Sequence, residues 1–404
     1  MTLSPARAPD GTGVRRLTAT LYGYAFLDDF VLLYPVYALL FSDTGLSVWQ
    51  ISSLFALWSL TGVLLEVPSG AWADAVSRRL LLRLGPLLTA AGFALWVLTP
   101  SYWAFALGFV LWGARGALGS GALEALVYEE LERLGAAERY AQVMGRARAA
   151  GHVAVMAALG LAGPVFAWGG YPAVGAASVL TCLASAATAT RFPEDRAVPG
   201  GGEKWSATLR DGLAEVRRDR ALRGALLLVP AVGAVWEALD EYTPLLVRDT
   251  GVAEVTVPYL LLLIWAGATA GSLLAGACER LGTAGLAAVL VGAALALAMG
   301  AAVRTPVALG LVALAFGGFQ LATVLADVRL QRRIDETGAT ARATLTSVAG
   351  LGSDLATVTV YGVYAAIETR AAHSTAFALL AVPYPVTAVL LLLGRPLRSR
   401  RRIP

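Results

Sequence analysis

The chain has 404 residues; 57% of them are hydrophobic, 15% are charged, and the formal net charge is +4. Because soluble domains average about 25% charged residues, this composition excludes an ordinary soluble domain. The two cysteines, Cys182 and Cys278, lie far apart in or beside apolar sequence, which excludes a disulfide framework and a cysteine-based metal site.

The N-terminal residues lack the apolar core and cleavage pattern of a signal peptide, and we expect a short cytosolic tail there. Twelve apolar segments follow, many of them of the length that is typical of transmembrane helices. The predicted helices cover residues 18–41, 48–71, 80–99, 102–126, 140–166, 171–190, 221–247, 255–276, 284–303, 305–327, 342–367 and 374–394.

A polar stretch separates the first six segments from the last six. It begins with RFPEDRAVPGGGEK, a linker pattern, and continues with Leu209, Leu213 and Val216 on one helical face. We therefore predict three regions: an N-terminal six-helix bundle over 1–190, a cytoplasmic linker with an amphipathic helix over 191–220, and a C-terminal six-helix bundle over 221–404.

The placement of arginine predicts the orientation, because cytoplasmic loops of membrane proteins are enriched in basic residues. With the N-terminus inside, the outer side keeps only Arg248, Arg304 and Arg370. The inner side holds Arg15, Arg16, Arg78, Arg79, Arg133, Arg139, Arg217, Arg218, Arg332, Arg333 and the basic C-terminal tail. We expect a multi-pass membrane protein with both termini in the cytoplasm.

An internal repeat relates the two halves. Aligned without gaps, FSDTGLSVWQISSLFALWSLTGVLLEVPSGAW matches VRDTGVAEVTVPYLLLLIWAGATAGSLLAGAC, so that Asp43 falls on Asp249 and Gly70 falls on Gly276. Two related six-helix halves are typical of transporters whose substrate site lies between the halves near the bilayer midplane.

A short stretch rich in charge and small residues follows the second predicted helix. In GAWADAVSRR, the residues Gly70, Ala73, Asp74, Arg78 and Arg79 match the loop signature G-x-L-A-D-x-x-G-R-K/R. The chain therefore resembles the major facilitator superfamily, and it is similar in its whole layout to the twelve-helix bacterial transporters that export drugs or metabolites.

The resemblance implies an all-α integral membrane fold in a bacterial cell (inner) membrane, with twelve transmembrane helices in two pseudo-symmetric six-helix bundles. It also implies that Asp74 and Arg78 form a charge latch that holds the cytoplasmic side closed. Glu129 or Glu130, at the cytoplasmic end of the fourth helix, is the expected partner of Arg78. The alternative is that the two arginines only set the topology.

Charged residues inside a membrane helix cost about 2.5–3.5 kcal/mol on insertion scales, so each one is a candidate functional residue. Asp28 and Asp29 lie in the middle of the first helix, where neighbours point about 100° apart. We expect one of them to bind a proton and the other to cap a helix or pair with an arginine. Arg115, followed by Gly119 and Gly121, resembles the R-x-x-x-G-x-G signature of proton-coupled members, which implies that it tunes a first-helix carboxylate; the alternative is a structural ion pair.

In the seventh predicted helix, Glu237, Asp240 and Glu241 share one stripe at spacing i, i+3 and i+4. They face a substrate cavity, or they meet extracellular water if the helix ends early, and the sequence leaves both readings open. Further predicted substrate-cavity residues are Tyr34, Gln320 and Asp354; for Asp354 the alternative is a packing role.

Two glutamates near the predicted cytoplasmic gate, Glu66 and Glu124, are expected to pair through bridging groups, or else each to cap a helix end. His152 is expected to pack or hydrogen-bond rather than titrate. The pairs Gly163-Pro164 and Gly169-Gly170 resemble an antiporter signature with altered spacing, which gives slight support to export.

No nucleotide-binding or metal-ligand pattern occurs, so we expect no cofactor, no enzymatic activity and no nucleic-acid partner. The predicted function is a monomeric, proton-coupled antiporter that exports small amphipathic compounds by alternating access, with its substrate, protons and the lipid bilayer as partners. The alternatives are an uptake symporter or uniporter for a small nutrient or metabolite, and a non-transporting membrane receptor or assembly factor. The absence of asparagine and the shortage of other amides in the helices disfavour sugar uptake.

Overall fold

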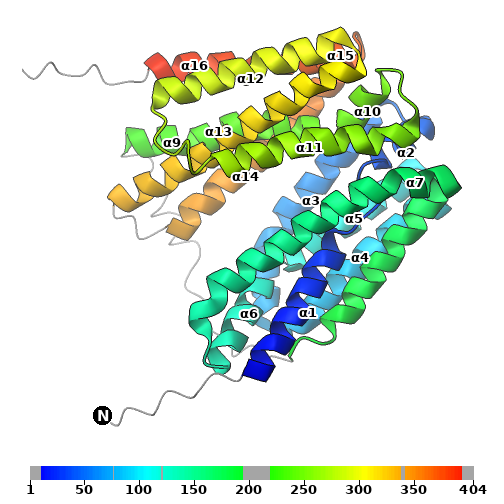
Figure 1. Cartoon of the computed structure of the whole chain (residues 1–404), viewed down its shortest axis with the longest axis vertical. Helices are drawn as coiled ribbons and strands as arrows, with labels where there is room; N and C mark the ends of the chain where they lie inside the picture. The colour runs from blue at the N-terminus through cyan, green and yellow to red at the C-terminus, as the bar shows by residue number, and fades with distance from the viewer. Residues whose placement is uncertain (1–10, 76, 120–121, 194–218, 338–341, 394–404) are drawn as a thin grey trace, which may run out of the picture. The chain divides into compact units, whose positions relative to one another are not determined.

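The computed structural model describes residues 11–75, 77–119, 122–193, 219–337 and 342–393, without the side chains of residues 66–75, 337 and 342–344. These described residues form helices and turns, with no β-strand among them (Figure 1). The amphipathic helix predicted for the linker falls mostly on residues outside this description. The chain divides into two compact units: Met1–Gly201 with Glu254–Tyr259, and Gly202–Ala253 with Leu260–Pro404.

Most helices of the first unit follow directly from the apolar segments. They are α1 (Gly11–Asp29), α2 (Tyr37–Asp43), α3 (Val48–Ala75), α4 (Arg78–Leu98), α5 (Tyr102–Gly119), α6 (Ala122–Arg133), the 3₁₀ turn η1 (Ala137–Arg139) and α7 (Tyr140–Ala189). The helices that follow are α9 (Arg220–Asp240), α10 (Thr243–Arg248), the 3₁₀ turn η2 (Glu254–Thr256), α11 (Val257–Leu274), α12 (Thr283–Val303), the 3₁₀ turn η3 (Pro306–Ala308), α13 (Leu309–Thr337), α14 (Arg342–Glu368), α15 (His373–Leu380) and α16 (Pro383–Leu393).

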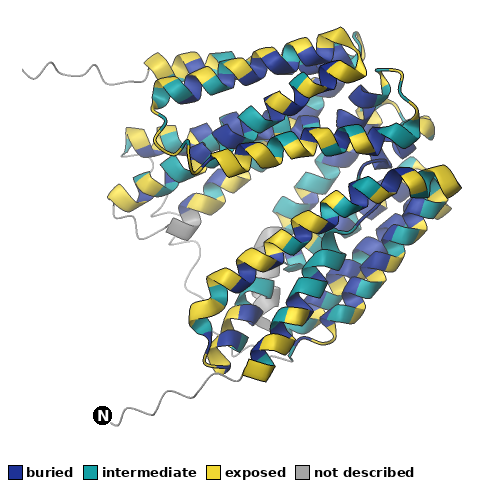
Figure 2. Ribbon diagram, viewed as in Figure 1, coloured by how far each residue is buried: buried dark blue, intermediate teal, exposed yellow. Residues whose placement is uncertain are grey.

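Eight helical stretches of the described chain are long and apolar enough to cross a membrane. Many large apolar side chains on them are exposed, including Trp168, Leu180, Leu273 and Leu295. Figure 2 shows such exposed residues along α7, α11 and α12. Apolar side chains exposed over whole helices are stable when lipid covers them, so the chain is a multi-pass membrane protein.

The first predicted helix, over 18–41, is wrong as a single helix, because the helix breaks between α1 and α2. Pro35 lies in the break; proline has no backbone N–H and its ring clashes with the carbonyl four residues earlier. The freed N–H of Leu33 donates instead to Oγ of Ser178 in α7, at 3.0 Å. A side chain from another helix therefore satisfies a backbone donor that the break exposes.

The seventh predicted helix, over 221–247, breaks in the same way. Helix α9 ends at Asp240 and α10 begins at Thr243, with Pro244 in its first turn. Glu241 and Tyr242 form the break. In the alignment of the two halves, the first residue of α2, Tyr37, falls on the first residue of α10, Thr243.

The repeated Asp-Thr-Gly sequence forms the same turn in both units. Gly45 has φ of 87° and Gly251 has φ of 82°, a left-handed conformation that glycine adopts readily. The preceding threonines both donate to a carbonyl of the helix before the turn, although in different registers: Thr44 donates to Leu40, four residues earlier, and Thr250 to Val247, three residues earlier, each at 2.7 Å. The sequence repeat is therefore a structural repeat at this point.

The predicted fifth and sixth helices form the two limbs of α7. They meet at Gly169 and Gly170, whose backbones are not helical; Gly170 has φ of 59°. Figure 1 shows the chain turning back at this point. The turn needs glycine because a positive φ is strained for other residues.

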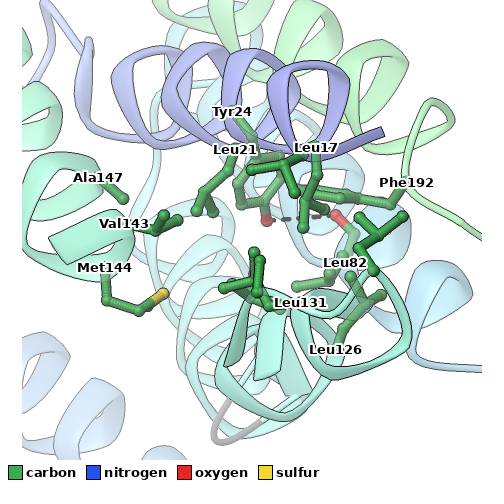
Figure 3. Close-up of a cluster of buried hydrophobic side chains, with 14 of the residues drawn as sticks. Leu17, Leu21, Tyr24, Leu82, Leu126, Leu131, Val143, Met144, Ala147 and Phe192 are labelled. Carbon is green, nitrogen blue, oxygen red and sulfur yellow. Dashed lines mark hydrogen bonds between the residues drawn. The ribbon is translucent and has the colours of Figure 1, made fainter. Parts of the chain in front are cut away.

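One end of the first unit is held together by a buried apolar cluster from α1, α4, α6 and α7. Leu17, Leu21 and Tyr24 of α1 point toward Leu82, Leu131 and their neighbours (Figure 3). The hydroxyl of Tyr24 donates to the Leu82 carbonyl at 3.3 Å. This cluster fixes α1 against the helices that carry the charged side chains discussed below.

Candidate functional site

An ion pair joins the broken first helix to α5. The guanidinium of Arg115 contacts the carboxylate of Asp28, and about a fifth of each side chain is exposed. Oγ of Ser185, in the second limb of α7, lies 3.4 Å from the same carboxylate. Of the two aspartates that the sequence offered as partners for Arg115, the structure therefore selects Asp28.

Small and aromatic residues surround Arg115. A Cβ on Gly85 of α4 would lie 3.1 Å from Cγ of Arg115, so the glycine leaves room for the arginine stem. One turn before Arg115, Trp112 stacks on Tyr34, with ring centroids 5.3 Å apart. Tyr34 lies in the break between α1 and α2, so it joins the immediate surroundings of the ion pair.

Asp29 points to a different helix. Its Oδ2 lies only 2.2 Å from the position that a Cβ on Gly151 of α7 would occupy. His152 follows Gly151 and is exposed in the described chain, close enough to act electrostatically on Asp29. The three charged residues Asp28, Asp29 and Arg115 are thus brought together and carry a net charge of −1 when all are ionised.

The acidic residues of the second unit lie where α9 ends. Glu237 is exposed and folds back toward Gly233, one turn earlier, where a Cβ would meet its Oε1 at 3.0 Å. Asp240 is the last residue of α9 and Glu241 lies in the break; both are partly buried. The helix does end early, as one of the two readings of the sequence required, but its chain continues as α10.

Two further carboxylates act electrostatically on Glu237: Asp354 of α14, a predicted cavity residue, and Asp327 of α13, which the sequence does not single out. Asp327 comes at the very end of the apolar segment 305–327, where a charge reads as the start of a loop. Beside them, Nε1 of Trp236 donates to Oγ1 of Thr323 at 3.1 Å. The predicted cavity residue Gln320 donates its side-chain amide to Oγ of Ser272 at 2.9 Å.

The predicted partner of Arg78 is present. Nη1 of Arg78 lies 2.6 Å from Oε2 of Glu129 in α6, whereas Glu130 pairs with Arg133. Arg79 donates to the Phe192 carbonyl at 3.4 Å, which ties α4 to the end of α7. Both arginines therefore have specific partners in the structure, and their role in a latch stays a prediction.

The rest of the loop signature is only partly visible. Ser77, which replaces the usual glycine, caps α4 by accepting from the backbone N–H of Leu80 at 3.4 Å. Glu66, Gly70 and Asp74 lie in α3 where side chains are not described, so their roles stay predictions. Glu124 lies in the first turn of α6, a favourable position for an acid at a helix N-terminus.

The second unit has its own pair between helix ends. Asp219 precedes α9 and accepts from the backbone N–H groups of Ala221 and Leu222, while Arg333 of α13 pairs with it at 2.9 Å. Burial raises the pKa of the Asp219 carboxyl, but these hydrogen bonds and the Arg333 charge outweigh it and hold the pKa below its ordinary value of 3.8. Arg332 of α13 pairs with Glu279, which follows the end of α11.

Metal-binding chemistry finds no support in the part of the chain that the structure describes: no group of three or more histidine, cysteine, aspartate or glutamate side chains there could hold an ion. The two cysteines, Cys182 and Cys278, are free thiols.

A family model described as Major Facilitator Superfamily matches residues 18–361. No curated protein matches the chain. Among solved structures, it is similar to a point variant of the nucleoside transporter NupG, with a TM-score of 0.76 and 13% identity over 93% of this chain and 99% of that one.

Two other similar structures are transporters. A D-xylose-proton symporter has a TM-score of 0.69 and 14% identity over 95% of this chain and 98% of that one. A bacterial homolog of the human lysosomal transporter Spinster has a TM-score of 0.64 and 16% identity over 97% and 96%, respectively. At these identities the likeness to the solved structures shows a shared fold.

Proposed function

Because the chain belongs to the major facilitator superfamily, we propose that it is a proton-coupled secondary transporter that takes up a small polar metabolite by alternating access. The proposal includes the layout implied by the family: twelve transmembrane helices in two pseudo-symmetric bundles, over 1–190 and 221–404, joined by the linker 191–220. The repeated turns at Gly45 and Gly251 support this layout. The arginine bias supports a cell-membrane location with cytoplasmic termini.

One observation carries the proton coupling: Asp28, Asp29 and Arg115 lie together inside the bundle of the first unit. Two carboxylates lie near one cation there, and only Asp28 contacts it directly. A buried ion pair is costly to separate because each lone charge lacks solvation, and a surplus carboxylate in a membrane span is costly unless it binds a proton. The site thus favours a change in protonation during transport.

Uptake is proposed in place of the export predicted from the sequence. Two similar folds are described as a nucleoside transporter and a D-xylose-proton symporter, and they support the alternative of an uptake symporter. The antiporter prediction rested on Arg115, the first-helix carboxylates and an aromatic lining; the charged pair serves symport equally well. For the second unit, we propose that Glu237, Asp240, Glu241, Gln320 and Asp354 line the solute path.

At the cytoplasmic end, we propose that Arg78 and Glu129 belong to the latch, together with Asp74. The pair supports this role because it connects the start of α4 to α6. Glu66, Gly70, Arg79 and Glu124 are proposed to support the same gate.

The direct test is uphill transport. Purified protein is reconstituted into liposomes, an inward proton gradient is imposed, and radiolabelled nucleosides and pentoses are offered in turn. We expect one solute class to accumulate above its outside concentration, and a protonophore to abolish the accumulation. A potential of 100 mV alone supplies about 2.3 kcal/mol per charge, or roughly a 50-fold gradient.

The variants Asp28→Asn and Arg115→Ala should lose accumulation, whereas the exposed-site control Arg139→Ala should keep it. Accumulation that requires the opposite proton gradient would instead establish antiport. Equilibration without accumulation would reduce the protein to a uniporter.

A further inference from the structure

Asp28 and Asp29 are adjacent in sequence but have different surroundings. Asp28 contacts the guanidinium of Arg115 and accepts weakly from Ser185. The carboxylate of Asp29 makes no ion pair or hydrogen bond among the described residues, and its Oδ2 lies against the backbone of Gly151 in α7. One carboxylate is held by a cation, and the other is not.

The charges that act on Asp29 come from three helices. They are Asp28 on its own helix, Arg115 on α5 and His152 on α7. Arg115 is committed to Asp28 by direct contact, so a proton on Asp28 would leave the arginine without its counter-ion. A proton on Asp29 would instead remove the one uncompensated negative charge, and the neighbouring ion pair would stay neutral as a whole.

Gly151 supplies the space that Asp29 occupies. It is buried, and any Cβ there would overlap Oδ2 of Asp29. The carbonyl oxygen of Ala25, one helical turn before Asp29, lines the same space, 3.7 Å from that Cβ position. The Ala25 carbonyl is therefore a nearby acceptor for a protonated Asp29. Helix α7 can lie this close to Asp29 because Gly151 has no side chain.

We propose that Asp29 is the residue that binds the transported proton, that Gly151 positions its carboxyl group, and that Asp28 and Arg115 remain a fixed ion pair. The inference rests on the proposed proton coupling and assigns its carrier. In each cycle the Asp29 carboxylate takes one proton from water on one side and releases it to water on the other, and no other bond is made or broken.

The test compares two readouts in the full-length protein. Proteoliposomes report solute-dependent proton movement with an enclosed pH dye, and exchange of labelled for unlabelled solute, which needs no net proton transfer. We expect Asp29→Asn to keep exchange within about twofold and to lose proton movement at least tenfold. Asp28→Asn should lose both, because Arg115 is left uncompensated.

Gly151→Ala tests whether Gly151 positions the Asp29 carboxyl group. Gly160→Ala is the control, because a Cβ on Gly160 meets nothing within 4 Å. Gly151→Ala should reduce proton movement several-fold more than exchange, and it should add nothing in the Asp29→Asn background. Gly160→Ala should leave both readouts unchanged. An effect of Gly151→Ala that persists in the Asp29→Asn background would overturn the positioning role.

A second measurement keeps the inference separate from the proposed function. An infrared difference spectrum between acidic and alkaline pH detects a protonated carboxyl group directly. Its band should disappear in Asp29→Asn and persist in the double variant Asp28→Asn/Arg115→Ala, which removes the ion pair without leaving an unpaired arginine to act on Asp29. The reverse pattern, or wild-type proton movement in Asp29→Asn, overturns the assignment. Exchange without proton movement in the wild type would refute proton coupling itself, and the infrared band would still decide where the proton binds.

Discussion

The backbone N–H of Leu33 donates to Oγ of Ser178, and both groups are buried. Leu33 lies in the break between α1 and α2, and Ser178 lies in the second limb of α7, 145 residues later in the chain. Ser178 also donates to the Val174 carbonyl of its own helix, at 2.7 Å. Its hydroxyl therefore orients toward a carbonyl and leaves a lone pair for the broken helix.

Replacing Ser178 by alanine should destabilise the fold, because a buried N–H without a partner costs about 1–3 kcal/mol. The thermal midpoint of the detergent-solubilised protein measures the effect. Ser353→Ala is the matched control, since within the described part of the chain the Ser353 hydroxyl donates only to the Ala349 carbonyl of its own helix. Equal midpoints for the two variants would show that the break does not depend on Ser178.

The contact between α11 and α13 should be intolerant of any side chain. A Cβ on Gly271 would lie 2.0 Å from the carbonyl oxygen of Gly317, and one on Gly267 would lie 2.1 Å from that of Ala313. Overpacking typically costs about 1–3 kcal/mol, and a clash with backbone cannot be relieved by rotating a side chain.

We therefore expect Gly271→Ala to lower the thermal midpoint clearly, while Gly292→Ala in α12, where a Cβ meets nothing within 4 Å, leaves it unchanged. A stable, monodisperse Gly271→Ala protein on size-exclusion chromatography would contradict this packing.

The pair of Arg78 and Glu129 should be worth little to stability but more to transport. The Glu129 side chain is 46% exposed, and exposed pairs contribute about 0–1 kcal/mol. The single variants Arg78→Glu and Glu129→Arg should both slow solute exchange through repulsion at the proposed latch. The double variant should recover most of the exchange rate; a double variant as slow as the singles would mean that the pair does not gate transport.

Asp219 gives the protein a stabilising contact that acid removes. Its folded pKa is below the ordinary value of 3.8, so the contact is complete above that pH and is lost as pH falls through the lower folded value. Asp219→Ala should lower the thermal midpoint at neutral pH, and its difference from wild type should shrink in strong acid. Asp219→Asn keeps a capping side chain and loses the charge, so its thermal midpoint at neutral pH should lie between those of Asp219→Ala and the wild type. A difference that does not depend on pH would exclude the ion pair with Arg333 as its cause.

Much of the fold could be predicted because long apolar runs are required to span a membrane. The described residues of each run are mainly helical, although the predicted helices 18–41, 221–247 and 374–394 each contain a break. The breaks after Asp29 and Asp240 were harder. Pro35 and Pro244 mark them in the sequence, but proline is tolerated inside membrane helices when a neighbour satisfies the freed backbone groups. At the first break this neighbour is Ser178. Nothing in the alanine-rich sequence around Ser178 marks it as the residue that would take this role.

The candidate site was predictable by residue type and not by partner. Charges in apolar runs pointed to Asp28, Asp29 and Arg115, and the loop signature pointed to Arg78 and an acid near the end of the fourth helix. Identifying Asp28 rather than Asp29 as the partner of Arg115 required the orientation of α1 about its own axis. Neighbouring residues differ by only about 100° around a helix, and the sequence does not define that orientation so closely.

Two residues near the site were missed for different reasons. Asp327 lies at the end of an apolar run, where a charge is ordinary. Gly151 does its work by lacking a side chain, and it stands among many other small residues of α7. Only the position of the neighbouring helix reveals that a Cβ there would meet Asp29.

The most direct measurement is the sign of proton movement when solute is added without any imposed gradient. Liposomes holding the protein and a pH dye receive an outside pulse of a transported nucleoside or pentose. Proton-coupled uptake predicts that the interior acidifies, that the effect saturates with solute, and that Arg115→Ala abolishes it. An interior that becomes alkaline would contradict symport and restore export by antiport, and an unchanged interior during solute entry would contradict proton coupling.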